Sequence, residues 1–72
     1  MDIKAKIGAR FRDIRKAKKL TQEKVSFEAD IDKSYISEVE NGLRNISIIN
    51  LEKLTNTVGI SLKDFFDTPD FA

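Results

Sequence analysis

The sequence contains no cysteine, no histidine and no tryptophan, and only one proline among its 72 residues. Without cysteine the chain forms no disulfide, offers no thiolate nucleophile and has no cysteine-ligated zinc. Without histidine it lacks the most frequent metal ligand and general base. Its apolar runs are only a few residues long, against the ~20 that span a bilayer, and no leader pattern opens it. The composition therefore predicts a cytoplasmic protein with no cofactor, no membrane contact and no enzymatic activity.

Charged side chains are abundant, and they are unevenly distributed along the chain. Residues 4–19 carry eight lysines and arginines against Asp13 alone, a local charge of +7, whereas residues 20–72 carry five basic and ten acidic side chains. A basic segment of this kind supplies salt-dependent attraction to polyanions such as nucleic acid. The alternative is an ordinary solvated helix face, and only the motif in residues 21–42 favours nucleic acid over it.

Apolar side chains recur at three- and four-residue steps along most of the chain, which predicts an all-α domain. The first helix is expected to end near residue 19, because Lys18 and Lys19 complement the negative end of its dipole. Four residues of the types that cap helix N-termini mark the expected starts of the later helices. They are Thr21, Asp32, Ser47 and Ser61.

Residues 21–42 encode two short helices joined by a tight turn. Asp30 stands where the chain must turn sharply, and aspartate tolerates a left-handed backbone. In the second helix Ile36 and Val39 face inward at a three-residue step, so the residues between them point outward. Two helices joined in this way form a helix-turn-helix, whose second helix lies in the major groove of DNA.

The pattern resembles the phage-repressor helix-turn-helix family, which is Cro/cI-like and is also called the xenobiotic-response-element family. The resemblance covers about residues 7–66 and rests on Gln22, Ser26, Asp30, Ile36 and Val39. The block of residues 34–45 is most similar to the small controller proteins of restriction-modification systems. The family commonly has glycine at the position of Asp30. The resemblance implies a compact five-helix domain of the lambda-repressor-like DNA-binding type, with the helix-turn-helix at the second and third helices.

The expected organisation is a single domain over residues 1–67, with the helix-turn-helix at about 21–40 and a dimer surface at about 46–66. Pro69 follows the last expected helix and cannot continue it. We therefore expect residues 68–72 to form a short frayed tail.

Side chains on the outer face of residues 33–40 are predicted to read bases, as the resemblance implies. Lys33 can donate to guanine O6 and N7, Ser34 can pair with several bases, and Glu38 can accept from cytosine N4. Ser37 shares their outward face. The alternative for Lys33 and Ser34 is plain solvent exposure, and Glu38 is equally consistent with a bystander role because phosphates repel a carboxylate.

Six polar or basic residues are candidate phosphate contacts, which fix the register of a protein on DNA without reading its sequence. They are Thr21, Gln22, Tyr35, Arg44, Arg12 and Lys16. The resemblance supports Gln22 and Arg44 most, and in controller-like relatives an arginine at position 44 also reaches a base. The alternative for Tyr35 is a ring that leans on the core with its hydroxyl in water.

Arg15 and Glu40 match two family positions that form an ion pair across the domain. The expected role of the pair is to hold the first helix of the domain against the end of the recognition helix, which is the second helix of the helix-turn-helix. A buried pair costs several kcal/mol when one partner is deleted, whereas an exposed pair contributes less than about 1 kcal/mol. The sequence leaves both possibilities open.

The chain has more apolar residues near its C-terminal end than one small core can hide. They are Ile46, Ile49, Leu62, Phe65 and Phe66. This excess predicts a two-fold homodimer, whose paired recognition helices would select a palindromic operator. The alternative is that both phenylalanines pack within the monomer.

These patterns predict a sequence-specific, double-stranded DNA-binding transcriptional regulator, with the controller of a restriction-modification operon as the leading role. A phage-type repressor, and an antitoxin or protein-interaction module with secondary DNA binding, are the alternatives. RNA polymerase is a further candidate partner. Both activation and repression stay open, because promoter position decides between them. Catalysis by the paired carboxylates of Asp30 and Asp32 is least favoured, since a turn and a cap explain both residues.

Overall fold

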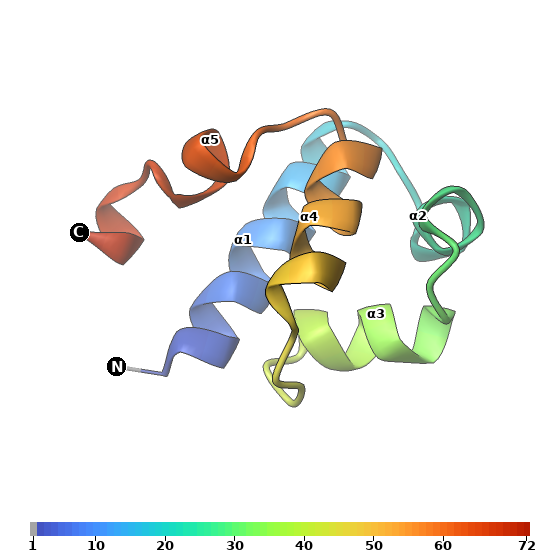
Figure 1. Ribbon diagram of the computed structural model, residues 1–72, viewed down its shortest axis with the longest axis horizontal. Coiled ribbons are helices and arrows are strands. Elements are labelled where there is room, and N and C mark those ends of the chain that lie inside the picture. The colour runs from blue at the N-terminus through green and yellow to red at the C-terminus, as the bar shows by residue number, and fades with distance from the viewer. Residues whose placement is uncertain (1) are drawn as a thin grey trace.

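The computed structural model describes residues 2–72, and within that range every regular element is a helix. The elements are α1 (Ile3–Ala17), α2 (Gln22–Ala29), α3 (Lys33–Glu40), α4 (Ile48–Thr57), α5 (Leu62–Phe66) and the short 3₁₀ helix η1 (Pro69–Phe71). None of these helices is long and apolar enough to cross a membrane. Figure 1 shows α2 and α3 towards one end of the long axis, with α5 and both chain ends towards the other. The predicted all-α, five-helix fold is confirmed.

Three of the four predicted helix caps form in the structure. The side chains of Thr21, Ser47 and Ser61 each accept a hydrogen bond from the backbone N–H three residues later, at 3.0 to 3.1 Å. Asp32 does precede α3, but its side chain makes no capping hydrogen bond. Asp32 therefore occupies the predicted N-cap position, but the prediction that its side chain caps the helix is wrong.

The end of α1 differs from the prediction. The helix stops at Ala17, Lys18 is its C-cap, and Lys19 adopts a left-handed backbone with φ 59°. The Leu20 N–H then returns to the Arg15 carbonyl at 3.0 Å, which satisfies one of the last free carbonyls of the helix. This turn also lets Leu20 pack against the core, so apolar burial fixes the end of the helix about two residues before the point predicted from charge.

The core takes at least one large, fully buried apolar side chain from each of the helices α1 to α5. These side chains are Phe11, Val25, Ile36, Leu54 and Phe65, each with an exposed fraction of 0%. A short domain of this kind has little apolar area to spare, so each buried side chain carries a large share of its stability.

Helices α1 and α3 approach each other closely at Gly8. A Cβ atom placed on Gly8 of α1 would lie 2.0 Å from the carbonyl oxygen of Val39 in α3. Only glycine allows the two backbones to come this close without moving. The contact brings the first helix directly against the end of the helix that carries the candidate base-reading residues.

Residues 68–72, which the sequence predicts to form a frayed tail, include a short 3₁₀ helix in the structure. The 3₁₀ helix η1 begins at Pro69, where the missing N–H carries no penalty. The ring of Phe71 meets the ring of Phe66 edge-to-face with 5.0 Å between centroids. Lys6 of α1 also donates its ammonium group to the Asp70 carbonyl at 2.8 Å. Partial burial of the Phe71 ring against the core thus accompanies a helix start that suits proline.

Candidate nucleic-acid interface

The turn between α2 and α3 is held by a local hydrogen-bond pair and by one left-handed residue. Asp30 has φ 54° and ψ 47°, as its position predicted. The Ser26 hydroxyl donates to the Ile31 carbonyl at 2.6 Å, and the Ile31 N–H returns to the Ser26 carbonyl at 3.2 Å. Val25 and Ile36 are buried on the facing sides of the two helices. The sequence thus folds into the helix-turn-helix geometry in which α3 projects one face outward.

The outer face of α3 carries all four candidate base-reading residues. Lys33 and Ser34 are exposed and lie in the first turn of the helix, while Ser37 and Glu38 are partly exposed and follow one turn later. Ile36, Val39 and Glu40 on the opposite side are buried. The structure therefore brings the four candidates together on a single accessible surface, and their contact with bases stays a prediction.

Lys33 has an intramolecular partner that the sequence did not reveal. Its ammonium nitrogen lies 3.2 Å from a carboxylate oxygen of Glu23 in α2, and both side chains are largely exposed. An exposed ion pair contributes at most about 1 kcal/mol, so Lys33 can leave it for a stronger acceptor. Glu23 thus pairs with Lys33 at the start of α3.

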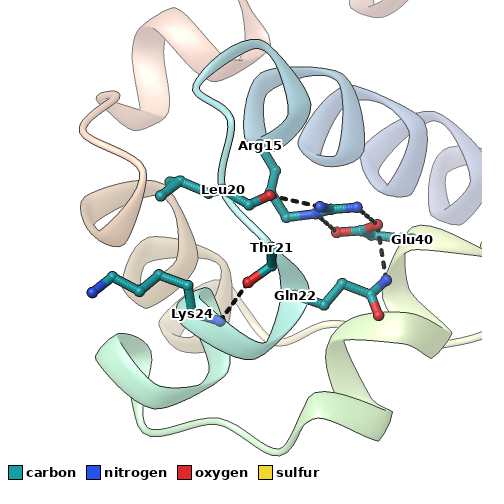
Figure 2. A network of polar contacts seen from close by, with 6 residues as sticks. All are labelled: Arg15, Leu20, Thr21, Gln22, Lys24 and Glu40. Atoms are coloured by element: carbon teal, nitrogen blue, oxygen red, sulfur yellow. Dashed lines mark hydrogen bonds and ion pairs between the residues drawn. The ribbon is translucent and has the colours of Figure 1, made fainter.

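Arg15 and Glu40 form the predicted ion pair, and the structure shows that the pair is buried; Figure 2 shows the network around it. Arg15 binds Glu40 with two hydrogen bonds, Nε to Oε2 at 2.7 Å and Nη2 to Oε1 at 2.9 Å. Its Nη1 donates to the Leu20 carbonyl at 2.8 Å. The Glu40 carboxylate raises the pKa of Arg15, first through the hydrogen bonds and then through its charge, against the opposing effect of burial. Two parallel hydrogen bonds of this kind fix orientation as well as charge.

Gln22 extends this network to the start of α2. Its side-chain nitrogen donates to Glu40 Oε1 at 3.1 Å, which ties the first residue of α2 to the last residue of α3. The amide keeps a second N–H, which is free to meet a phosphate oxygen. The neighbouring Thr21 uses its hydroxyl oxygen as an acceptor for the cap, so its O–H proton is also available. The network therefore positions two of the predicted phosphate contacts.

The basic residues of α1 divide into two groups with different surroundings. Arg10 donates Nε to the Phe65 carbonyl at 2.9 Å and Nη2 to the Asp64 carbonyl at 3.0 Å, so it fastens α1 to α5. Arg12 is half-buried, Lys16 is exposed, and neither makes a side-chain hydrogen bond within residues 2–72. Only part of the +7 segment is thus free to act on a polyanion, and phosphate contact by Arg12 and Lys16 stays a prediction.

Tyr35 and Arg44 meet in space although they lie on different elements. The guanidinium carbon of Arg44 lies 4.6 Å from the centroid of the Tyr35 ring. The Tyr35 hydroxyl oxygen accepts a hydrogen bond from Asn50 Nδ2 of α4 at 3.2 Å. Tyr35 is half-buried. Sequence reasoning had placed Tyr35 and Arg44 separately and had missed Asn50.

Four of the five residues of the predicted dimer surface keep some exposed surface, and their contact with a second chain stays a prediction. Ile49 is exposed, while Ile46, Leu62 and Phe66 are half-buried. Ile48, Leu62 and Phe66 line an open apolar groove between α4 and α5. Phe65 is corrected, because its ring is fully buried in the monomer core and has no surface to offer a second chain.

Comparison with known proteins decides the family. A helix-turn-helix family model matches residues 11–65. The chain belongs to the helix-turn-helix family. Within the family, the control protein C.MunI from Mycoplasma sp is 42% identical over 66 residues, which cover 90% of this chain and 89% of that protein.

Two solved structures in this helix-turn-helix group superpose on nearly the whole chain. The restriction-modification controller protein C.AhdI from Aeromonas hydrophila has a TM-score of 0.84 at 40% identity, covering 88% of this chain and 96% of that one. The controller protein C.Esp1396I, solved as a tetramer in complex with its natural 35 base-pair operator, also has a TM-score of 0.84, at 31% identity, covering 89% of this chain and 84% of that one. The sequence resemblance, including its narrower likeness to controller proteins, is confirmed.

Three residues that contribute to the helix-turn-helix surface carried no signal that sequence alone could interpret. Glu23 and Asn50 act through contacts to residues 10 and 15 positions away. Phe27 of α2 is 85% exposed, although Val25 and Ala29 of the same helix are buried in the core. Phe27 follows Val25 and Ser26 in the sequence, and this position does not indicate whether its ring is exposed or buried.

Proposed function

We propose that this chain is a sequence-specific transcriptional regulator that binds double-stranded DNA and serves as the controller protein of a restriction-modification operon. The observation that carries the proposal is the accessible outer face of α3, with Lys33 and Ser34 exposed while Ile36 and Val39 fix the helix to the core. A helix presented in this way fits the major groove, where side chains distinguish all four base pairs. The controller proteins among its relatives, and the operator bound by one of them, support the proposal.

Polar groups beside α3 suit the sugar-phosphate backbone. Thr21 and Gln22 stand at the start of α2, where the helix dipole also favours a negative charge. Arg44 lies in the exposed connector after α3 and carries a positive charge. Contacts of this kind fix the register of α3 in the groove and make the affinity fall with salt.

The proposed assembly is a homodimer on a palindromic operator. Ile48 and Ile49 are 63% and 66% exposed, and with Leu62 and Phe66 they form an apolar surface on α4 and α5. Pairing two copies through this surface would bury it and would present two α3 helices to successive turns of DNA, ~34 Å apart. Because the target is chromosomal or plasmid DNA, we place the protein in the cytoplasm.

A second candidate function is an antitoxin or protein-interaction module that binds DNA only secondarily. The exposed Phe27 favours it, because this ring lies on α2 and outside the proposed dimer surface. A toxin gene next to the gene for this chain would support the alternative. A neighbouring methyltransferase or endonuclease gene would support the controller.

The test of the proposed function is selection of bound duplexes from a random pool, followed by titration of the winners at two salt concentrations. A palindromic consensus whose affinity exceeds that of random DNA at both salt concentrations supports a dimeric, sequence-specific regulator. Equal retention of all sequences overturns it. Binding that disappears entirely at the higher salt, with no consensus, would indicate only the attraction of the basic α1 for polyanions.

Replacing Lys33 by alanine is expected to weaken operator binding by about 1–3 kcal/mol and to relax the preference at one base position in each half-site. The reason is the loss of its donors to a base edge. The matched control is Lys24→Ala, which removes the same charge from the exposed side of α2, where Lys24 pairs with Glu28 at 3.2 Å. Repeating the selection with both variants decides the role: a uniform loss with an unchanged consensus would make Lys33 a phosphate contact instead.

A further inference from the structure

Three elements meet at the side of the recognition helix through Tyr35, Arg44 and Asn50. Tyr35 is the third residue of α3, Arg44 lies in the irregular connector between α3 and α4, and Asn50 is the third residue of α4. Asn50 donates Nδ2 to the Tyr35 hydroxyl oxygen at 3.2 Å. Its own backbone N–H is already used in the cap of Ser47 at 3.1 Å, so the backbone that carries this amide is fixed.

The direction of this hydrogen bond leaves the tyrosine proton free. A tyrosine hydroxyl has one proton to donate and accepts with its oxygen. Because Asn50 supplies a proton to that oxygen, the hydroxyl's own proton must point elsewhere. A phosphate oxygen is a suitable acceptor, and a hydroxyl that already accepts one hydrogen bond becomes a stronger donor. Asn50 therefore both orients and strengthens the donor that Tyr35 can offer to DNA.

The ring of Tyr35 is also the support for Arg44. The connector makes backbone hydrogen bonds at Gly42 and Leu43, to the carbonyls of Val39 and Glu38, but none at residues 44–46 within the described chain. The guanidinium group of Arg44 rests on the Tyr35 ring, with its central carbon 4.6 Å from the centroid. Cation–π contact at an exposed site contributes about 0.5–1 kcal/mol, enough to bias a flexible arginine toward one position. A ring that is held at its hydroxyl end presents a fixed platform.

We propose that Asn50 is a positioning residue for DNA binding: through the Tyr35 hydroxyl it aims one neutral donor at a phosphate and steadies the ring that holds the cation of Arg44. The inference rests on the proposed DNA-binding function. It assigns no DNA contact to Asn50 itself, whose side chain is half-buried and occupied by Tyr35. Its effect on affinity passes entirely through Tyr35.

The test is a double-mutant cycle on the selected operator with Asn50→Ala, Tyr35→Phe and the combined variant. Removing one neutral hydrogen bond of this kind is expected to weaken binding about threefold to tenfold in each single variant. Because Asn50 acts only through the hydroxyl, the combined variant is expected to bind no more weakly than Tyr35→Phe alone. The control is Asn56→Ala, the same substitution at an exposed position six residues further along α4, which is expected to bind like the unaltered protein.

Three further measurements separate a positioning role of Asn50 from a general loss of structure. A less firmly held Arg44 is expected to reduce the slope of affinity against salt in Asn50→Ala by up to about one phosphate contact, whereas Asn56→Ala keeps the full slope. Asn50→Leu preserves the side-chain volume but not the donor, so it is expected to bind as weakly as Asn50→Ala. Thermal unfolding of each variant is followed in parallel, and the comparison is made among variants that melt like the unaltered protein.

The outcomes distinguish a failure of the proposed function from a failure of the inference about Asn50. If the unaltered chain shows no sequence preference, the proposed function fails whatever Asn50 does. If the unaltered chain is selective but Asn50→Ala binds equally well, or Asn50→Leu recovers full affinity, the inference about Asn50 is overturned and the function stands. Losses that multiply in the combined variant would show that Asn50 touches DNA directly and would also overturn the inference.

Discussion

Replacing Glu40 by alanine is expected to lower the free energy of unfolding by about 3–5 kcal/mol, because the buried guanidinium group of Arg15 is left without its partner. A domain of this size has only a few kcal/mol of net stability to lose, so the variant should be largely unfolded. Urea unfolding followed by circular dichroism measures the difference. Operator binding should disappear with the fold, because Glu40 joins α3 to α1 and α2.

Two variants provide comparisons for the loss of stability expected in Glu40→Ala. Gln22→Ala removes a single 3.1 Å hydrogen bond to the same carboxylate and is expected to cost about 1 kcal/mol. Arg15→Met combined with Glu40→Leu leaves no buried charge and is expected to recover most of the lost stability. A cost below about 1 kcal/mol for Glu40→Ala would mean that the pair behaves like an exposed one.

The stability that Arg15 contributes through the ion pair should not change with pH in the neutral range. Glu40 raises the pKa of Arg15, and a group whose pKa is raised by folding contributes its stability fully below its ordinary value. That contribution is lost only as the pH rises through the raised value, in strong alkali. A change in stability near neutrality would therefore have to come from other groups.

Replacing Phe65 by alanine is expected to lower the free energy of unfolding by about 3–5 kcal/mol, because its ring is fully buried and its removal leaves a cavity between α5 and the rest of the core. Thermal unfolding at low protein concentration measures this effect in the monomer. The loss should be independent of any dimer contact.

The neighbouring Phe66 provides the matched control. Its ring is half-buried, lines the open groove with Ile48 and Leu62, and meets the Phe65 ring edge-to-face at 5.0 Å. Phe66→Ala is expected to destabilise the monomer less and to weaken self-association, which sedimentation equilibrium measures. If Phe65→Ala dissociates the dimer with unchanged unfolding, the assignment of the two rings is reversed.

Local chemistry made much of this fold predictable. Thr21, Ser47 and Ser61 define helix starts because their side chains satisfy backbone donors within three residues. The left-handed turn at Asp30 follows from the short spacing between two apolar stripes. The Arg15–Glu40 pair followed from family resemblance, since nothing local connects residues 25 positions apart.

The features that sequence could not supply depend on tertiary contacts. Phe65 and Phe66 are adjacent in a five-residue helix, which is too short for periodicity to separate the buried ring from the half-exposed one. Arg10 is one of several similar basic residues until the carbonyls of Asp64 and Phe65 are placed beside it. The short helix η1 could not be predicted because the packing of Phe71 depends on aromatic rings from α5.

The side chains on the outer face of α3 take no part in the buried contacts that keep the domain folded. The side chains of Ser34, Ser37 and Glu38 make no hydrogen bond to any other part of residues 2–72, and the buried side chains of α3 lie on its opposite face. The proposed base-reading role therefore predicts that exchanging these three side chains changes the target sequence and leaves the fold intact. Lys33 is the exception, since each replacement there also sets free the carboxylate of Glu23. A library of variants designed to bind different operators should therefore change positions 23 and 33 together.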